Sequence, residues 1–149
     1  MVTFSAVLVA VGSYNPRNKK SEKYEDGSWS EIQEPPLVSL SDYAAIFHAD
    51  SFYYFGGFES GSGYLRSILR LNATSWAWSN AGQMKSSRRG HAVILVKNTF
   101  MVIGGGYTRQ HSACLLNNGK FSCEEKSSSL TDYVDRPMLF LVNDSYENC

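Results

Sequence analysis

The chain has 149 residues, which is enough for one ordinary domain with a sizeable apolar core. Lysine plus arginine and aspartate plus glutamate both number 14, so no net charge attracts nucleic acid or an anionic membrane surface. No apolar run approaches the roughly 20 residues of a membrane-spanning helix, and we expect neither a nucleic-acid partner nor membrane insertion. Aromatic residues make up 13% of the chain and glycines number 12, which favours short strands and tight turns.

The first predicted element is the apolar run FSAVLVAVG, Phe4 to Gly12. Such a run is similar to the short core of a signal peptide, but the positively charged segment that precedes such a core is missing. The run also ends at a glycine, as later apolar runs of the chain do. We therefore interpret it as a β-strand, and a signal peptide is the alternative.

A β-hairpin is predicted next, in the stretch KYEDGSWSEI. Asp26 and Gly27 suit the two central positions of a type I′ turn, where both residues need a positive φ. Counting outward from this turn places Tyr24 opposite Trp29 in a non-hydrogen-bonded pair, where facing side chains lie closest. We expect Trp29 to be buried in the core between neighbouring units.

Two stretches in the middle of the chain repeat each other. Asp42 to Gly57, DYAAIFHADSFYYFGG, aligns without a gap with Gly90 to Gly105, GHAVILVKNTFMVIGG. Each stretch has an apolar segment, a small turn and a second apolar segment that ends at two glycines, as two adjacent antiparallel strands would. We assign an architectural role to the four glycines, because they allow close backbone approach and positive φ: Gly56, Gly57, Gly104 and Gly105.

A polar loop and a second hairpin follow each glycine pair. In the stretch RLNATSWAW, Leu71 and Trp78 are expected to form the facing apolar pair, and Trp76 lies on the same face as Trp78. In the stretch CLLNNGKFSCEE, the dipeptide Asn-Gly at positions 118–119 suits a type I′ turn. Counting outward from that turn places Leu116 opposite Phe121.

The same count places Cys114 directly opposite Cys123, in a non-hydrogen-bonded position whose backbone separation suits a disulfide. A bridge here indicates an oxidising compartment, and two N-glycosylation sequons, at Asn72 and Asn143, point the same way. We therefore expect a secreted, extracellular glycoprotein, and a cytoplasmic protein with reduced thiols is the alternative. Cys149 has no evident partner within the chain.

The last predicted element is RPMLFLV, Arg136 to Val142, which matches the spacing of the first strand in RRGHAVIL. The chain is thus one repeat domain over residues 1–149. Its units lie at about 1–32, 41–80 and 88–125, and the first strand of a further or closing unit lies within 136–149. The first unit begins with material of a second strand and lacks the strand that precedes it elsewhere.

These motifs resemble the Kelch repeat, whose units carry a double glycine after the second strand and an apolar residue followed by a tryptophan. The matching positions are Gly12, Tyr24 and Trp29, then Gly56, Gly57, Leu71 and Trp78, then Gly104, Gly105, Leu116 and Phe121. The chain departs from the pattern at Val11-Gly12, which replaces a glycine pair, and at Phe121, which replaces the tryptophan. The resemblance implies an all-β, Kelch-type β-propeller segment built of four-stranded antiparallel blades.

Three such units are too few for a closed ring, because propellers ordinarily have about four to eight blades. We expect the remaining blades to come from a longer chain, of which this one is a fragment. In the alternative, the C-terminal strand completes the first blade, which requires either a short ring or another copy of the chain that completes it.

No pattern of residues indicates a catalytic, metal or cofactor site. The histidines His48, His91 and His111 lack the spacing of metal ligands. The glycine-rich stretches at 61–63 and 104–106 lack the lysine and serine or threonine that follow in a phosphate-binding loop. We therefore expect a non-catalytic protein without cofactor or metal.

The loops at the ends of the strands are the better candidates for recognition. Arg88 and Arg89 precede the first strand of the third unit, and Tyr107 and Arg109 follow its glycines. In the Kelch arrangement such loops cluster at the ends of the propeller and bind protein partners, and arginine and tyrosine are frequent interface anchors. For each of these residues, a solvated loop position is the alternative. We expect a protein–protein interaction module whose partner is of unknown identity.

Two other functions remain open at this point. An intracellular Kelch adaptor recruits substrates to a ubiquitin ligase, but it needs an oligomerisation domain of the BTB type, which these residues do not contain. A copper oxidase on the same scaffold uses tyrosine and histidine ligands, and Tyr107 and His111 are the residues that would suggest it.

Overall fold

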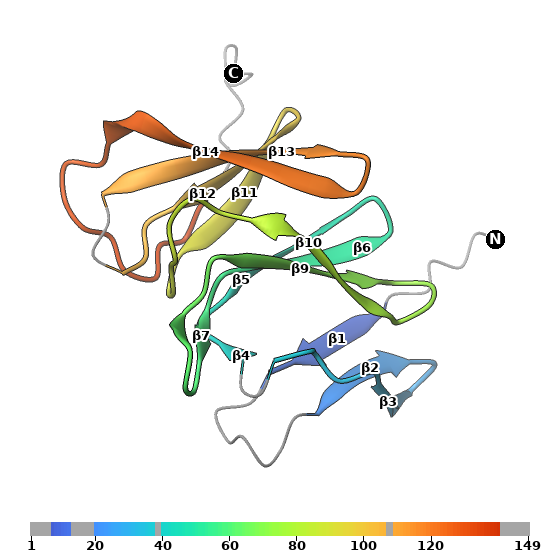
Figure 1. Ribbon diagram of the computed structural model, residues 1–149. Helices are drawn as coiled ribbons and strands as arrows, with labels where there is room; N and C mark the ends of the chain where they lie inside the picture. Colours follow the sequence, from blue (N-terminus) through green and yellow to red (C-terminus); the bar gives the residue numbers. More distant parts are fainter. Residues whose placement is uncertain (1–6, 13–19, 38–39, 107–108, 141–149) are drawn as a thin grey trace, which may run out of the picture.

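The computed structural model describes residues 7–12, 20–37, 40–106 and 109–140, and every regular element in these ranges is a β-strand (Figure 1). The prediction of an all-β chain is therefore confirmed for the described residues. The strands are β1 (Leu8–Val11), β2 (Ser21–Glu25), β3 (Ser28–Ile32), β4 (Leu40–Ser41), β5 (Ala44–His48), β6 (Ser51–Phe55), β7 (Phe58–Glu59), β8 (Gly63–Tyr64), β9 (Ser67–Asn72), β10 (Trp78–Gln83), β11 (Ala92–Val96), β12 (Thr99–Ile103), β13 (Gln110–Asn117) and β14 (Lys120–Ser129).

The first unit is a three-stranded antiparallel sheet of β1, β2 and β3. Asp26 and Gly27 join β2 to β3 with φ values of 50° and 84°, so both turn residues have the positive φ that a type I′ turn needs. Tyr24 lies opposite Trp29, as predicted, and the centroids of their rings are 5.3 Å apart. The two turn residues thus determine the register of this hairpin.

The second unit consists of β5, β6, β9 and β10, and the third unit of β11, β12, β13 and β14. Ala44 of β5 lies opposite Phe55 of β6, and at the equivalent positions of the repeat Ala92 of β11 lies opposite Ile103 of β12. Each hairpin continues into two more antiparallel strands, and neighbouring strands in the sheet are neighbours in the unit's own order. The two aligned stretches of sequence therefore have the same structure at the same register.

The second and third units are joined into one eight-stranded sheet, whereas the sequence predicted separate four-stranded units. β10 and β14 share one parallel pair, Gly82 opposite Phe121, and β5 and β11 contact each other at the other end. The sheet is therefore nearly closed and barrel-like. Gly82 explains the junction, because a Cβ atom there would lie 2.8 Å from the carbonyl oxygen of Phe121.

A third, smaller sheet of β4, β7 and β8 forms where the sequence predicted only a polar loop. Leu40 of β4 lies opposite Glu59 of β7, and Phe58 of β7 lies opposite Tyr64 of β8. The amide of Leu65 then donates a hydrogen bond to the carbonyl of Gly57, at 2.9 Å. The loop after the first glycine pair is thus folded back onto the strand ends.

Successive side chains along each strand of the second unit point alternately toward the first unit and toward the third, as the two-residue period of a β-strand requires. The three units lie in layers, with the second unit in the middle (Figure 1). The core between the second and third units contains Tyr53, Phe55, Ile68, Ala81, Met84, Phe100, Val102, Cys114, Phe121 and Cys123. The core between the first and second units contains Tyr54, Leu69 and Leu71, with Val9, Val11, Ile32, Trp76 and Trp78 packed against it.

Cys114 and Cys123 form a disulfide, as predicted, in the core between the second and third units. The turn between β13 and β14 has positive φ at both of its residues, 49° and 74°, so the predicted register is confirmed. Leu116 lies opposite Phe121, nearer the turn than the disulfide.

The sequence suggested that Leu116 and Phe121 are equivalent to Leu71 and Trp78, and this is wrong. The equivalent pair lies on the same face, two residues farther from the turn. In the second unit, the row across three strands is Phe52, Leu71 and Trp78. Phe100, which aligns with Phe52 in the repeat, is opposite Cys114 and not opposite Leu116. The disulfide therefore occupies the place of the Leu71–Trp78 pair. The longer β13–β14 hairpin adds one further apolar pair, and a count along the sequence alone cannot place it.

The glycine pairs allow close backbone approach at corresponding places in the two units. A Cβ atom at Gly57 would lie 2.6 Å from the carbonyl oxygen of Ser41, and one at Gly105 would lie 2.5 Å from that of Arg89. Ser41 and Arg89 are themselves equivalent positions of the repeat. The architectural role predicted for these glycines is thus consistent with their surroundings.

Two expectations are wrong in this structure. Trp29 is 53% exposed and not part of the core, because no other described unit lies against the outer face of the first unit, whereas Trp78 packs between units as predicted. Residues 136–140 form no strand, because none of the described strands lies beside them to pair with.

Candidate binding surface

The two neighbouring arginines that the sequence predicted as binding residues, Arg88 and Arg89, differ in their exposure to solvent. The side chain of Arg88 is completely buried, whereas that of Arg89 is 43% exposed. Arg88 is therefore not a surface anchor, and the prediction of a binding role for it is corrected here. Only Arg89 remains available to a partner.

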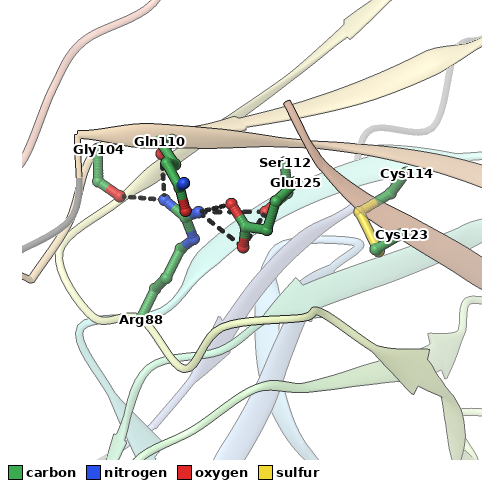
Figure 2. A network of polar contacts seen from close by, with 7 residues as sticks. All are labelled: Arg88, Gly104, Gln110, Ser112, Cys114, Cys123 and Glu125. Atoms are coloured by element: carbon green, nitrogen blue, oxygen red, sulfur yellow. Dashed lines mark hydrogen bonds and ion pairs between the residues drawn. A yellow bond between two sulfur atoms is a disulfide. The ribbon is translucent and has the colours of Figure 1, made fainter. Parts of the chain in front are cut away.

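Arg88 is the centre of a network of polar contacts within the third unit (Figure 2). Its guanidinium group donates hydrogen bonds to both carboxylate oxygens of Glu125, at 3.0 and 3.2 Å, and to the hydroxyl of Ser112 at 3.2 Å. It also donates to the carbonyl oxygens of Gly104 and Gln110, at 3.1 and 2.7 Å. Both carboxylate oxygens are bonded by the same guanidinium nitrogen, Nη2, and together with the carbonyl contacts of Nη1 this network ties the loop before β11 to β13 and β14.

The repeat itself contains the signal that Arg88 is buried. When the alignment is extended toward the N-terminus, Arg88 falls on Leu40, which is 2% exposed, so it occupies an apolar position of the unit. A charged residue at such a position needs a partner, and Glu125 of β14 provides it. An alignment extended from Asp42 back to Leu40 would therefore have identified the position of Arg88 as internal.

Arg89 lies over two aromatic rings of the β7–β8 hairpin. Its guanidinium carbon is 4.9 Å from the ring centroid of Tyr64 and 5.8 Å from that of Phe58. Arginine stacked on aromatic faces keeps its N–H groups free at the edge of the plane, and the tyrosine is 37% exposed. The hairpin thus holds the cation in place without using up its hydrogen-bond donors.

Asp42 lies between two arginines from different parts of the chain. Its carboxylate is 3.9 Å from Arg89 and 3.7 Å from Arg136, whose side chain is 70% exposed. The backbone brings these residues together, since the amide of Gly90 donates to the carbonyl of Asp42 and the amide of Arg136 donates to that of Gly90. Two guanidinium groups around one carboxylate leave an excess of positive charge at this place.

We call this group the arginine surface, and it consists of Asp42, Phe58, Tyr64, Arg89 and Arg136. Sequence reasoning identified only Arg89 among its members. Asp42 precedes the first strand of the second unit, Arg89 precedes the first strand of the third, and Arg136 follows the last strand of the third, so no local pattern could have grouped them. The signal that existed was again the repeat, because Asp42 and Gly90 are equivalent positions.

A cavity of about 230 Å³ adjoins the arginine surface and is lined in part by Asp42, Arg136 and His91. The imidazole of His91 is 6% exposed, and neither ring nitrogen makes a hydrogen bond of normal geometry to a described residue. The pKa of His91 is lowered to about 4, mainly by burial and to a smaller extent by the charge of Arg88, while the backbone of Phe55 opposes the shift. His91 is therefore neutral at pH 7.

The equivalent residue in the second unit is Tyr43, whose hydroxyl donates a hydrogen bond to the carbonyl of Val11. Burial raises the pKa of Tyr43, so this side chain is also neutral. Both residues pack beside a glycine pair, and both face the unit that precedes them. His91 is thus an internal residue of the repeat, with one edge at the cavity.

The other predicted binding residues lie apart from the arginine surface or outside the described residues. Arg109 is exposed and its guanidinium carbon lies 5.2 Å from the ring centroid of Tyr133, which is 53% exposed. Tyr107 lies outside the described residues, as do the sequon asparagine Asn143 and the last residue, Cys149.

Asn72, the first sequon asparagine, is half-buried at the end of β9. Its side-chain oxygen accepts hydrogen bonds from the amides of Thr74 and Ser75, at 2.9 and 2.8 Å. These bonds hold the turn between β9 and β10, and they are made by the side-chain oxygen of Asn72 and not by the amide nitrogen to which a glycan would attach.

Within the ranges that the structure describes, no group of three or more histidine, cysteine, aspartate or glutamate side chains is placed to hold a metal ion. No helix in these ranges is long and apolar enough to cross a membrane. Comparison with known proteins adds no relative: no family model matches this chain, and no curated protein matches it at a significant level.

Proposed function

We propose that this chain is a segment of a Kelch-type β-propeller and that it serves as a non-catalytic protein-interaction module. The propeller part of the proposal is supported by the repeat. Antiparallel units in the same strand order pack face to face, and each glycine pair approaches the chain at an equivalent residue. A propeller of stacked blades would have these features, and they are the support for this part of the proposal.

One observation carries the interaction part, namely the arginine surface. Arg89 is held against Tyr64 and Phe58, while the carboxylate of Asp42 is shared between Arg89 and Arg136. The ion pairs of Asp42 with Arg136 and Arg89 are long, at 3.7 and 3.9 Å, so both guanidinium groups have hydrogen-bond donors left for another carboxylate. Arginine and tyrosine together are the residue types that dominate the energetics of protein interfaces.

The partner that this chemistry fits is a protein that presents an acidic side chain from an exposed loop. The carboxylate of such a loop would pair with the edge of the Arg89 guanidinium, and an apolar or aromatic neighbour would pack on Tyr64. Because the charged groups are partly exposed, we expect binding to weaken as the salt concentration rises.

The experiment is a selection of peptides from a phage-displayed random library on the immobilised chain. We expect the enriched peptides to carry aspartate or glutamate, and we expect Arg89→Ala to weaken their binding about tenfold or more. The matched control is Lys97→Ala, which removes a cation at the far end of β11 from the arginine surface. Selected peptides that bind both variants as well as the wild type would contradict the proposed surface.

We also propose that the protein is secreted, because the disulfide between Cys114 and Cys123 is compatible with an oxidising compartment. The measurement is the intact mass of protein made through a secretory pathway, before and after reduction and deglycosylation. A bridged hairpin with sugar at Asn72 or Asn143 would support secretion. Free thiols together with bare sequons would contradict it.

A further inference from the structure

The outer face of the third unit repeats a face that is buried elsewhere in the molecule. Met101 and Ile103 of β12 align with Tyr53 and Phe55, which are 2% and 0% exposed in the core between the second and third units. A groove of about 880 Å³ covers this outer face, and Leu139 and Phe140 of the segment after Arg136 line it together with residues of the strands. Apart from this segment, no described unit lies on the surface of the third unit that corresponds to the one with which the second unit receives its neighbour.

The outer face of the first unit is the counterpart. Leu8 and Trp29 lie at the two ends of the row Leu8, Tyr24 and Trp29, and they are 59% and 53% exposed. In the second unit the same row is Phe52, Leu71 and Trp78, and it packs against the preceding unit. Among the described residues, the first unit thus has no preceding neighbour and the third has no following one.

Among the described strands, the first unit also has no counterpart of the first strand of the other units. In the other units a first strand pairs with the second, as β5 does with β6, but among the described strands β1 pairs only with β2. Phe47 of β5, on the face of the second unit toward the first, is 54% exposed as a result. One edge of β1 and one aromatic side chain are left uncovered at the same place.

The segment after Arg136 has the place of a first strand but no second strand to pair with among the described strands. Arg136 follows Gly90 in the series of backbone hydrogen bonds at the arginine surface, as Gly90 follows Asp42. The residues after Asp42 and Gly90 form the first strands β5 and β11. The residues after Arg136 therefore have the position of a first strand in the repeat, yet they form none here, and Met138 and Phe140 are 81% and 78% exposed and unpaired in the sheets.

We propose that two copies of this chain associate head to tail into a closed ring of six units, in which the segment that begins at Arg136 supplies the missing first strand of the other copy's first unit. The outer face of each third unit then packs on the outer face of the other first unit. Two such contacts related by a twofold axis close the ring, and six units fall within the range of about four to eight that propellers use.

A second copy fits these faces because one chain provides both halves of the contact. The first unit offers an open edge and an uncovered phenylalanine, and the other copy brings an unpaired apolar segment with two exposed side chains. By equivalence with the β5–β6 register, Leu139 corresponds to Ala45 and lies opposite Ala10, the counterpart of Tyr54. This inference rests on the propeller part of the proposed function and not on the binding of a partner.

The first test is the molar mass of the chain in solution, by light scattering or sedimentation at micromolar concentrations. We expect twice the 16.6 kDa of one chain. Leu8→Asp and Phe140→Asp change side chains that are exposed in one copy, so each variant is expected to fold but to weaken association about tenfold or more. Lys85→Asp, in the exposed loop between β10 and β11, is the control and is expected to remain dimeric.

The second test determines the register. In a Cys149→Ser background, Ala10→Cys combined with Leu139→Cys places two thiols in a non-hydrogen-bonded pair between copies. We expect mild oxidation to give a covalent dimer on a non-reducing gel. The control combines Val9→Cys with Leu139→Cys, which moves one thiol to the opposite face of β1 and should leave monomers.

A monomer at every concentration, or a series of larger open assemblies, would overturn the proposal. A dimer that forms equally well in all variants and gives no cross-link would overturn the strand exchange as well as the ring. None of these results bears on peptide binding at the arginine surface. Conversely, failure of the peptide selection with a dimeric, cross-linked protein would reject the binding surface and leave the ring intact.

Discussion

The second and third units have the same strands at the same register, yet within the described residues a neighbouring unit covers the second on both faces and the third on only one. Phe55 and Ile103 occupy equivalent positions, and the first is fully buried while the second lines an open groove. Local sequence determines the strand, its turn and its glycines in both cases. What differs is the neighbour, and so the energetic importance of a residue in this repeat depends on which unit contains it.

The largest expected effect tests this difference directly. Phe55→Ala removes a fully buried ring from the core between the second and third units, and we expect it to lower the free energy of unfolding by about 3–5 kcal/mol. Ile103→Ala at the equivalent open position should cost about 1 kcal/mol or less in the dissociated chain. Chemical denaturation at low protein concentration measures both. Equal losses of unfolding free energy in the two variants would contradict the conclusion that Phe55 is buried between units and Ile103 is not.

The two neighbouring arginines sharpen the comparison within one loop. Arg88→Met leaves the carboxylate of Glu125 without its partner, and we expect a loss of about 3 kcal/mol of stability. Arg89→Met breaks only a partly exposed ion pair and a stacking contact, so about 1 kcal/mol or less is expected. Thermal unfolding of the two variants distinguishes them. A stable Arg88→Met protein would argue against the buried network.

Acid should destabilise the third unit through His91. The pKa of its imidazole is lowered from 6.5 to about 4 by burial, so the unfolded chain binds more protons between these values. Stability from this group is complete above pH 6.5 and is lost as the pH falls toward 4, by on the order of 3 kcal/mol.

The variant that tests this is His91→Gln, whose side chain does not titrate. Its free energy of unfolding should depend less on pH between 7 and about 4.5 than that of the wild type. His48→Gln is the matched control, and it should keep the acid sensitivity because the buried imidazole at position 91 is still present. An unchanged slope in His91→Gln would assign the acid sensitivity to other groups.

The disulfide gives the smallest of the four effects. It replaces, in the third unit, the Leu71–Trp78 pair of the second, and it closes a short hairpin loop with a sequence separation of 9. We expect the double variant Cys114→Ala/Cys123→Ala to lose about 2–3 kcal/mol. Denaturation of this variant beside the reduced wild type provides the measurement. A loss much larger than that of reduction alone would indicate that packing, and not the cross-link, stabilises this place.

Much of the fold follows from the sequence by itself, because hairpin register is a local property. Two turn dipeptides, at positions 26–27 and 118–119, fix which residues face each other, and with them the disulfide. The gapless repeat likewise gives β5, β6, β11 and β12 together with their glycines. These features depend on residues within a few positions of one another, so a single sequence is enough to find them.

Only the tertiary structure decided which residues are buried and which are available to a partner. Trp29 and Trp78 have the same place in their hairpins, but only Trp78 has a neighbouring unit to pack against. Likewise the arginine surface joins residues as far apart as Asp42 and Arg136. Burial and long-range ion pairs are set by the packing of one sheet on another, and the local pattern of each strand is the same whether or not that neighbour is present.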